Sequence, residues 1–491
     1  MALIGLRAAR TARRFRRLQR LRSFAALGAV AAMGGALSLS VPVPAGAAAT
    51  GGTLYVTSGG TDSGTCRLHT HPCATIAYAI SQANPNSTIS VGAGTYTQQL
   101  VISQNLTIVG SAGQTVIEPT TLSTADTDTD STTPQYAIID VTPGVNVTLK
   151  GLTVNGTNAE SQFDSCADNF IGVYFHDASG TMTKDTVTDI ELPQADFGCQ
   201  DGVGVYVASD SSGTSAVSMD HVTVNAYDKN GITCDDTNTT CSVTHSMVTG
   251  IGPTPLIAQN GIQIWGDSSA TISDDTVSAN SYSNASNADG NQATGLLLLD
   301  AGTLSVTNNK VSNSDINIYA GDAYTGIIPT ATPGTWTISQ NKISGATDNI
   351  TGGSPGYGDG VQLDSTTNPV TVTQNTIKGS AENGISLLGV SNATVSANMT
   401  SINDGDGIYV GGPGTSVTTG SSGNTVSGNT SRSNTRAGIM ADTGTGTNTV
   451  SANTVARNVT YDLEDLGTGN TWSGNTCVPQ FDSKGVGLCG G

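Results

Sequence analysis

The chain has 491 residues and a formal net charge of −19, with 38 acidic residues against 19 basic ones. This negative balance excludes nucleic acid and anionic membrane surfaces as favoured partners, because like charges repel. Beyond the N-terminus, no hydrophobic pattern of helical period lasts longer than about three turns, which argues against a helical fold.

The N-terminal segment has the features of an export signal. Residues 1–22 carry eight Arg and no acid, Phe24–Leu39 is mostly apolar, and Ala45–Ala47 offers a small-residue cleavage site. The apolar run is too short for a membrane span, so the sequence predicts a signal peptide over 1–49 and no transmembrane segment. Its removal leaves 11 basic and 38 acidic residues, a net charge of −27. We therefore expect a secreted, extracellular protein.

The next segment reads as short strands around one short helix. We expect a helix over Pro72–Ala83, with Ile76, Ile80 and Ala83 on one face. The expected strands are Thr53–Val56, Thr88–Val91, Gly94–Tyr96, Leu106–Gly110 and Thr115–Ile117. A helix over the first of these coils would cap an otherwise open sheet edge.

Two phrases then recur every 22 to 35 residues, and such periods indicate a solenoid. The first consists of an apolar residue, a hydroxyl residue, any residue and then a short polar residue, as in Val372-Thr373-Gln374-Asn375. Its column is Asp185, Asp220, Ser246, Asp275, Asn309, Asn341, Asn375, Asn398, Asn429, Asn453 and Asn475. The second begins Asp201-Gly202-Val203, Asn230-Gly231-Ile232, Asn260-Gly261-Ile262, Asp359-Gly360-Val361, Asn383-Gly384-Ile385 and Asp406-Gly407-Ile408. Neighbouring coils must share one core, and stacked Asn would satisfy the backbone at a tight turn. These patterns predict an all-β fold, a single-stranded right-handed parallel β-helix.

Six N-terminal segments resemble the N-terminal block of pectin-lyase-like β-helix proteins. They are Tyr55-Val56, Pro72–Ile76, Ala79-Ile80, Thr88–Val91, Gly94–Tyr96 and Leu106–Gly110. The downstream repeats are similar to those of secreted bacterial proteins of that superfamily. The resemblance implies one β-helix domain over 50–491, with the cap and first coils in 50–118, repeats with inserts in 119–460, and a terminal coil with a tail in 461–491. Lyases, hydrolases, epimerases and non-enzymatic surface proteins share this fold.

All eight Cys lie in the part after the signal peptide, which fits an oxidising compartment. Proximity along the chain suggests pairing of Cys66 with Cys73, Cys234 with Cys241, and Cys477 with Cys489, which leaves Cys166 for Cys199. A zinc site is disfavoured because no Cys-x-x-Cys spacing and no clustered His accompanies them.

Long inserts interrupt the first two thirds of the repeats. They fall at 190–200, 251–259, 280–293, 320–335 and 346–358. Most precede the Gly-Val or Gly-Ile strand, so we expect them at one edge of one sheet. Long loops on a regular solenoid are often where binding occurs, although surface decoration is the alternative.

Alternation along that strand predicts a row of outward side chains. If Val203, Ile232, Ile262, Leu296, Ile316, Val361 and Ile385 point inward, the outward row is His176, Tyr206, Asp235, Trp265, Leu299, Tyr319 and Asp364. Coils stack about 4.8 Å apart, which places successive aromatics of the row roughly 10 Å apart. Aromatic faces at that spacing suit sugar rings. The candidate substrate-binding residues are therefore His176, Tyr206, Trp265 and Tyr319, unless inserts cover them.

Acidic residues gather near the same row, namely Asp201, Asp235, Asp236, Asp267 and Asp300. Glycoside hydrolysis needs two carboxyls, and Asp201 with Asp235 on adjacent coils would supply them. Asp359 and Asp406 form a second candidate pair, although Asp before Gly is also an ordinary turn residue. The Asp235-Asp236 pair resembles part of the polygalacturonase pattern, but Gly-His-Gly and Arg-Ile-Lys are missing.

Elimination is the other chemistry that the resemblance implies. Its base would be Lys229, and calcium would neutralise the uronate carboxylate. The sequence thus favours a monomeric secreted protein that binds polysaccharide and acts as a hydrolase or lyase, with Asp201, Asp235, Asp236 and Lys229 as catalytic candidates. The alternative is a non-catalytic surface or matrix protein that binds glycan or only withstands the extracellular environment.

Overall fold

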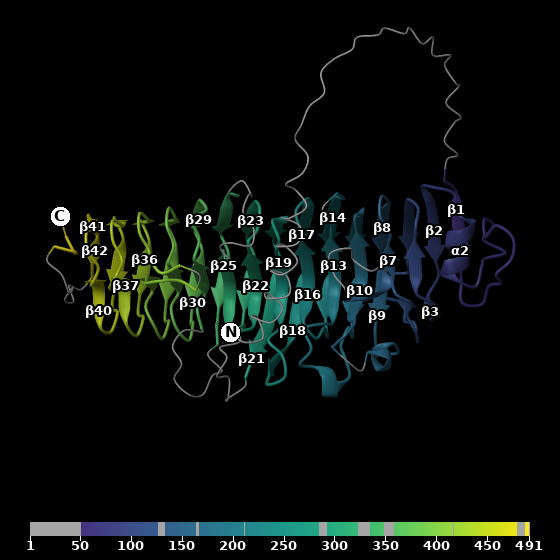
Figure 1. The fold of residues 1–491 in the computed structure, drawn as a ribbon, viewed down its shortest axis with the longest axis horizontal. Coiled ribbons are helices and arrows are strands. Elements are labelled where there is room, and N and C mark those ends of the chain that lie inside the picture. The colour runs from purple at the N-terminus through teal and green to yellow at the C-terminus, as the bar shows by residue number, and fades with distance from the viewer. Residues whose placement is uncertain are drawn as a thin grey trace, which may run out of the picture.

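The computed structural model describes residues 51–125, 133–163, 166–210, 212–283, 292–322, 334–347, 358–415, 417–478 and 487–490. The signal peptide predicted over 1–49 and parts of the predicted inserts lie outside the described residues. Three long sheets run side by side along a straight rod (Figure 1), and every strand pairs parallel to its neighbours.

Sheet A contains β1 (Thr53–Val56), β2 (Ser87–Val91), β5 (Leu106–Val109), β8 (Asn146–Lys150), β11 (Ser179–Thr183), β14 (Ser215–Asp220), β17 (Thr239–Thr244), β20 (Ser269–Ser273), β23 (Leu304–Thr307), β26 (Trp336–Ser339), β29 (Val370–Thr373), β32 (Thr394–Ser396), β35 (Thr425–Ser427), β38 (Thr449–Ser451) and β41 (Thr471–Ser473). Sheet B contains β3 (Gly94–Tyr96), β6 (Thr115–Ile117), β9 (Leu152–Asn155), β12 (Thr186–Thr188), β15 (Thr223–Asn225), β18 (Met247–Thr254), β21 (Thr276–Tyr282), β24 (Lys310–Ser312), β27 (Lys342–Ser344), β30 (Thr376–Lys378), β33 (Met399–Ser401), β36 (Thr430–Arg432), β39 (Thr454–Ala456) and β42 (Thr476–Cys477). Sheet C contains β4 (Leu100–Ile102), β7 (Gln135–Val141), β10 (Asn169–His176), β13 (Val203–Ala208), β16 (Asn230–Asp235), β19 (Asn260–Ile264), β22 (Thr294–Leu299), β25 (Ile316–Gly321), β28 (Val361–Asp364), β31 (Ile385–Leu388), β34 (Ile408–Val410), β37 (Ala437–Ala441) and β40 (Tyr461–Asp465).

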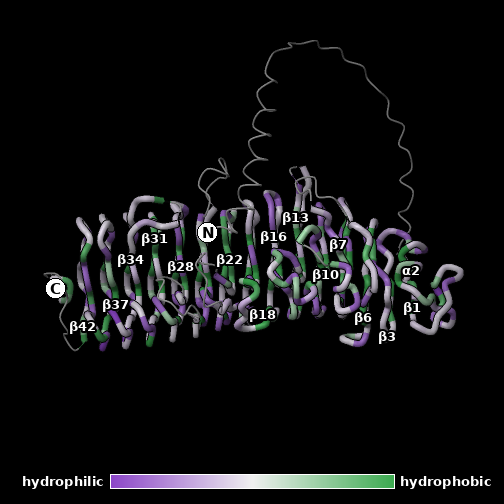
Figure 2. Tube along the Cα trace, turned by 60° about the horizontal axis from the view of Figure 1, so that its bottom comes forward, coloured by the Kyte–Doolittle hydropathy of each residue, from purple (hydrophilic) through white to green (hydrophobic). Residues whose placement is uncertain are grey.

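The chain visits the sheets in the order A, B, C and then returns to A one rung further on. Val, Ile and Leu alternate with polar residues along each strand, so one side of each sheet faces a shared core that runs the length of the rod. The hydropathy of the trace repeats coil after coil in Figure 2. The expected all-β, single-stranded parallel β-helix is confirmed.

The helix α2 (Ile76–Gln82) lies at the N-terminal end of the rod, where Ile76, Ala79 and Ile80 are buried in the core. The Thr75 hydroxyl accepts a hydrogen bond from the Tyr78 amide and so caps the helix. α2 thus covers the first coil, as expected. Two short 3₁₀ helices, η1 (Glu160–Gln162) and η2 (Gln194–Asp196), lie in the inserts.

A buried ladder of amides connects the coils at the turn from sheet A to sheet B. It contains Asn309, Asn341, Asn375, Asn398, Asn429, Asn453 and Asn475. The Asn375 side-chain Nδ2 donates to Oδ1 of Asn398 at 3.0 Å and to the backbone oxygen of Ile338 at 2.9 Å. The backbone N–H of Asn375 also donates to the Asn398 Oδ1, at 2.9 Å. Each rung therefore bonds to the coil on either side, as the Asn column predicted.

Upstream of Asn309 the ladder positions carry Asp275 and Ser246 in place of Asn. Ser246 donates its backbone N–H to Asp275, and Asp275 donates its own to Asn309. On the coil of β14 the ladder position belongs to Val222, whose N–H donates to the Ser246 hydroxyl at 3.0 Å. The expected place of Asp220 in the column is thus wrong by two residues.

Two further ladders, which the sequence analysis missed, occupy the other turns of the later coils. Asn424, Asn448 and Asn470 bond to one another before the strands of sheet A. Asn403, Asn434 and Asn458 do so before the strands of sheet C.

The Gly of the second phrase sits inside the corner between sheets B and C. A Cβ on Gly231 would lie 2.5 Å from Cγ1 of Val248, so only Gly fits. The register pairs Val203 with Asn230 and Val205 with Ile232. Gly204, between them, is therefore the counterpart of Gly231. Asp201-Gly202 is therefore not a copy of this phrase. Val203 and Ile316 face outward and belong to small clusters outside the main core, which corrects the expected inward row.

The four expected disulfides all form, between Cys66 and Cys73, Cys166 and Cys199, Cys234 and Cys241, and Cys477 and Cys489. Cys166 and Cys199 lie in the connections before β10 and β13, so this bridge joins two inserts. The described parts of the connections before sheet C project beyond one edge of the rod (Figure 1). The expectation that most inserts precede one sheet is confirmed.

Replacement of Asn375 by Ala should lower the free energy of unfolding by about 1–3 kcal/mol, because it leaves buried donors and acceptors of two neighbouring coils without partners. Denaturant unfolding measures the loss. Thr376→Ala, at an exposed neighbour, is the control and should have little effect. Equal stability of Asn375→Ala and the wild type would contradict the role of the ladder.

Replacement of Asp275 by Asn should stabilise the protein at pH 8 by about 1–3 kcal/mol and much less at pH 5. Burial raises the pKa of Asp275 to about 7, above its value in the unfolded chain, so its contribution is full at low pH and is lost as pH rises through 7. Asn is the ladder's own residue and does not titrate. Unfolding of both proteins from pH 4 to pH 9 measures the difference, and parallel pH profiles would contradict the prediction.

Candidate functional site

The outer face of sheet C, from β10 to β28, brings together most of the residues expected to bind a substrate. Register pairing aligns Tyr174, Tyr206, Thr233, Gln263, Leu297, Tyr319 and Gln362 in one outward row. His176, Ala208 and Asp235 begin the adjacent row, and Trp265, Leu299, Gly321 and Asp364 continue it. The expected single row is thus two rows on one face, two residues apart along the strands.

The N-terminal part of this face is an aromatic stack. The ring of Tyr174 lies 5.5 Å from His176 and 5.3 Å from Tyr206, nearly parallel to both. Tyr174 and His176 are buried, whereas Tyr206 is half-buried. The Tyr206 hydroxyl lies 3.4 Å from a carboxylate oxygen of Asp235. Tyr206 therefore packs on the buried ring of Tyr174 and remains partly exposed to solvent.

Tyr319 has a different environment from Tyr206. It is 9% exposed, and its hydroxyl donates to Asp364 at 2.9 Å. Asp364 is buried and also accepts from the backbone and hydroxyl of Thr415. Tyr319 thus offers little ring surface and holds a buried carboxylate. Trp265 packs on the Leu299, Ile316 and Tyr319 cluster but stays half-buried.

The half-buried residues of this region form what we call the sheet C patch. It consists of Tyr206, Asp235, Asp236, Gln263, Trp265, Asp267, Leu297 and Asp300. The patch offers two aromatic rings beside four carboxylates, at the edge where the strands of sheet C end. Such a surface combines stacking area with hydrogen-bond acceptors, which is what a sugar ring with its hydroxyls needs.

Two carboxyls at this edge have shifted acidity. Burial and the nearby carboxylate of Asp322 raise the pKa of Asp267 above its usual range. Burial also raises the pKa of Asp322, although hydrogen bonds from Thr366 and Thr367 oppose the shift. Asp267 follows β19 and Asp322 follows β25, two coils further on. Sequence reasoning missed Asp322 because it stands between the end of a strand and an insert, but its place after Gly321 repeats that of Asp300 after Leu299.

Asp201 and Lys229 lie at the opposite edge of sheet C. Asp201 precedes β13, whereas Asp235 ends β16, and register separates them by about seven extended residues, roughly 20 Å. The expected Asp201–Asp235 pair is therefore not formed. Asp201 instead lies near Asp228, whose pKa burial raises to about 9, with Lys229 opposing the shift and Glu191 and Asp201 adding to it. The ammonium group of Lys229 donates to the backbone oxygen of Ala258 at 2.6 Å.

Asp359 and Asp406, the second candidate pair, each accept a hydrogen bond from a backbone amide. Both are buried before strands of sheet C. Asp359 accepts from the amide of Asn383, and Asp406 accepts from the amide of Ala437. This is the turn role that Asp before Gly often has.

Within the described part of the chain, two groups of three side chains bring metal-ligating atoms within 4.8 Å of one another. They are Asp220 with His221 and His245, and His176 with Asp177 and Asp210. Both contain imidazole, whereas calcium prefers oxygen ligands throughout. Neither group is therefore of the calcium type, and calcium binding stays a prediction.

Residues 294–478 match the family model described as a right handed beta helix region. The fold of the chain is a right-handed parallel β-helix. This confirms the handedness and the fold that the resemblance implied. No curated protein sequence matches this β-helix protein significantly.

Several solved structures are similar to this chain at low sequence identity. The catalytic unit of a GH87 alpha-1,3-glucanase from Streptomyces thermodiastaticus is 16% identical, with a TM-score of 0.48 over 88% of this chain and 70% of that one. The Dettilon tailspike protein is also 16% identical, with a TM-score of 0.44 over 79% of this chain. The periplasmic alginate epimerase AlgG is 11% identical, with a TM-score of 0.41 over 80% of this chain and 77% of that one. The chain spans 63% of the length of the tailspike protein.

Replacement of Trp265 by Ala should cost less than about 1.5 kcal/mol of stability, because the ring is half-buried on an outer cluster. Trp336→Ala is the matched comparison and should cost about 3–5 kcal/mol, since Trp336 is fully buried in the main core. Thermal unfolding of both variants measures this. Equal losses would place Trp265 in the core and remove it from the patch.

Proposed function

We propose that the β-helix protein acts outside the cytoplasm on a polysaccharide, which it binds along the sheet C patch. The observation that carries the proposal is the pairing of Tyr206 and Trp265 with carboxylates on one half-exposed face. Tyr206 and Trp265 lie two rungs apart along the rod and two residues apart along the strands, roughly 12 Å in all and comparable to the length of two sugar rings. A straight rod with a repeated surface suits a long linear chain.

The disulfides support the proposed location, and the charge bears on the kind of glycan. Four bridges close in this chain, and such bridges persist in oxidising compartments. In the part of the chain that the structure describes, no helix has the length and apolar character of a membrane span. We propose release into the medium after cleavage of the segment 1–49. The surplus of acid favours a neutral or weakly charged glycan, since a polyuronate would be repelled.

Hydrolysis is the reaction that we propose, with Asp267 and Asp322 as its carboxyl pair. General acid catalysis is favoured by a carboxyl with a raised pKa, and burial together with Asp322 raises the pKa of Asp267. The two residues lie two rungs apart, roughly 10 Å along the rod before side-chain reach is counted. That spacing is nearer the wider separation of inverting enzymes than the shorter one of retaining enzymes. Asp235 and Asp236, one coil before Asp267, would bind sugar hydroxyls.

Elimination is less well supported by the geometry. Lys229, the expected base, lies across the sheet from the patch and donates to a backbone oxygen. The described clusters of metal ligands contain imidazole rather than only oxygen. A non-catalytic glycan-binding role uses the same patch without the carboxyl pair.

The decisive experiment incubates the protein without residues 1–49 with neutral and acidic polysaccharides, with and without calcium. Reducing ends and the absorbance of unsaturated products are both measured. We expect reducing ends without new absorbance, and a loss of at least about 100-fold in Asp267→Asn and Asp322→Asn. Asp404→Asn, at an exposed carboxylate on a coil without a long insert, is the control and should keep full activity.

Other outcomes would overturn parts of the proposal. Calcium-dependent absorbance would replace hydrolysis by elimination. Binding without any product, lost in Trp265→Ala, would establish the non-catalytic role. If the protein neither binds nor cleaves any glycan of the panel, the glycan proposal is refuted.

A further inference from the structure

One coil departs from the repeat at the turn from sheet A to sheet B. The last residue of each sheet A strand from β11 to β41 belongs to one row in the register. All members except one carry a hydroxyl: Thr183, Thr244, Ser273, Thr307, Ser339, Thr373, Ser396, Ser427, Ser451 and Ser473. The exception is Asp220. The same coil also replaces the polar ladder residue by Val222.

The next residue in this turn has a positive φ on many coils, and here it is histidine twice in succession. His221 has φ 56° and His245 has φ 50°, each directly after its sheet A strand. Because the coils are in register, the two rings stack with centroids 5.0 Å apart and an interplanar angle of 19°. The chain has only five histidines. Two of them occupy this turn position on successive coils, beside Asp220, the one acid among the hydroxyl residues that end the strands β11 to β41 of sheet A. Such a local departure from the repeat is of the kind found at functional sites.

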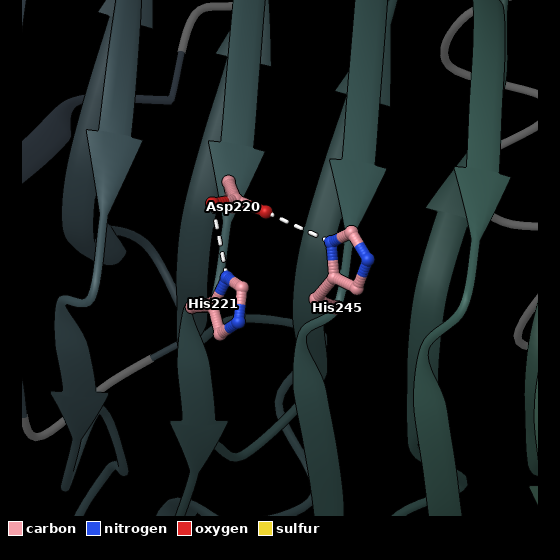
Figure 3. Close-up of side chains that lie close together, drawn as sticks. All are labelled: Asp220, His221 and His245. Atoms are coloured by element: carbon pink, nitrogen blue, oxygen red, sulfur yellow. Dashed lines mark hydrogen bonds and ion pairs between the residues drawn. The ribbon is translucent and has the colours of Figure 1, made fainter.

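Asp220 lies between the two imidazoles (Figure 3). One carboxylate oxygen is 2.9 Å from Nδ1 of His221, and the other is 3.0 Å from Nδ1 of His245. The Thr244 hydroxyl also donates to Asp220, at 3.1 Å, and so orients the carboxylate from outside the cluster. All three side chains are open to solvent, with exposed fractions of 53% for His221, 54% for His245 and 38% for Asp220. An ion and its water ligands have free access.

We propose that Asp220, His221 and His245 form a surface site for a divalent transition-metal ion, of which zinc is the best match. Two imidazoles and one carboxylate are ligands that zinc accepts, with an open position left for water. Tetrahedral zinc with bonds of about 2.0–2.2 Å places its ligands about 3.4 Å apart. The carboxylate oxygens lie 2.9 Å and 3.0 Å from the two Nδ1 atoms, and all three ligating atoms lie within 4.8 Å of one another. Side-chain shifts of no more than about 1.5 Å therefore turn the hydrogen-bonded cluster into a coordination shell.

Charge on the neighbouring coils modulates the site. Lys184 occupies the corresponding turn position on the preceding coil, and Asp274 occupies it on the following coil. The lysine opposes a cation and the aspartate favours one. The site also lies at the junction of sheets A and B, on a different part of the coil from the sheet C patch. Metal binding is therefore independent of the proposed glycan binding.

The test is calorimetric titration of the protein without residues 1–49 with zinc chloride above pH 7, at physiological salt and with millimolar magnesium present. Magnesium occupies sites made only of oxygen and leaves imidazole sites open. We expect one zinc ion per chain, and at least about a tenfold loss of affinity in His221→Ala, His245→Ala and Asp220→Ser. Cobalt in place of zinc should give a visible spectrum that these variants lack.

Asp220→Ser doubles as the folding control, because it restores the hydroxyl of the other coils and should keep the wild-type Tm. His71→Ala, at an exposed histidine outside the cluster, should bind zinc as the wild type does. Zinc binding that is unchanged in the His221→Ala, His245→Ala double variant would overturn the proposal, as would no binding by the wild type.

Discussion

The stacking of buried amides at the turn from sheet A to sheet B is the constraint on which the rest of the structure depends. Asn375 bonds both to the coil before it and to the coil after it, through its side chain and its backbone. A slip of one residue in any strand would break bonds on two neighbours and turn core side chains outward. The coils are therefore in register, and residues such as Asp220 and His245, 25 positions apart, meet side by side.

The fold was predictable because its main signals repeat. The Asn column, the short Val and Ile strands and the N-terminal helix each stand out in the chain, and all three take the expected place. Register across an insert was not predictable. Asp201-Gly202 reads like Asn230-Gly231, yet Val203-Gly204 is the true counterpart, because an insert changes the spacing before β13. A local pattern carries no information about how many residues a loop absorbs.

The sequence predicted which side chains lie on the outer face of sheet C, but not which of them are exposed to solvent. Alternation placed His176, Tyr206, Asp235 and Trp265 outward, and they do share the outer side of sheet C. Exposure depends on what packs over each side chain, so Tyr206 and Tyr319 differ although both belong to one row. Asp201 and Asp235 belong to adjacent coils, which suggests a pair, but they lie at opposite ends of their strands. The metal cluster was hidden because Asp220 fitted the ladder column in the wrong register.

The ladders also bear on how such a protein changes length during evolution. In the later coils the same bonds recur at spacings of 22 to 31 residues, and Asn429 and Asn453, 24 residues apart, have no long insert between them. Duplication or loss of one such coil adds or removes one rung of every sheet, and the new neighbours find the same partners. The rod can thus grow in steps of about 4.8 Å at its C-terminal part. Such a change leaves the coils that carry the sheet C patch and the histidine pair unaltered.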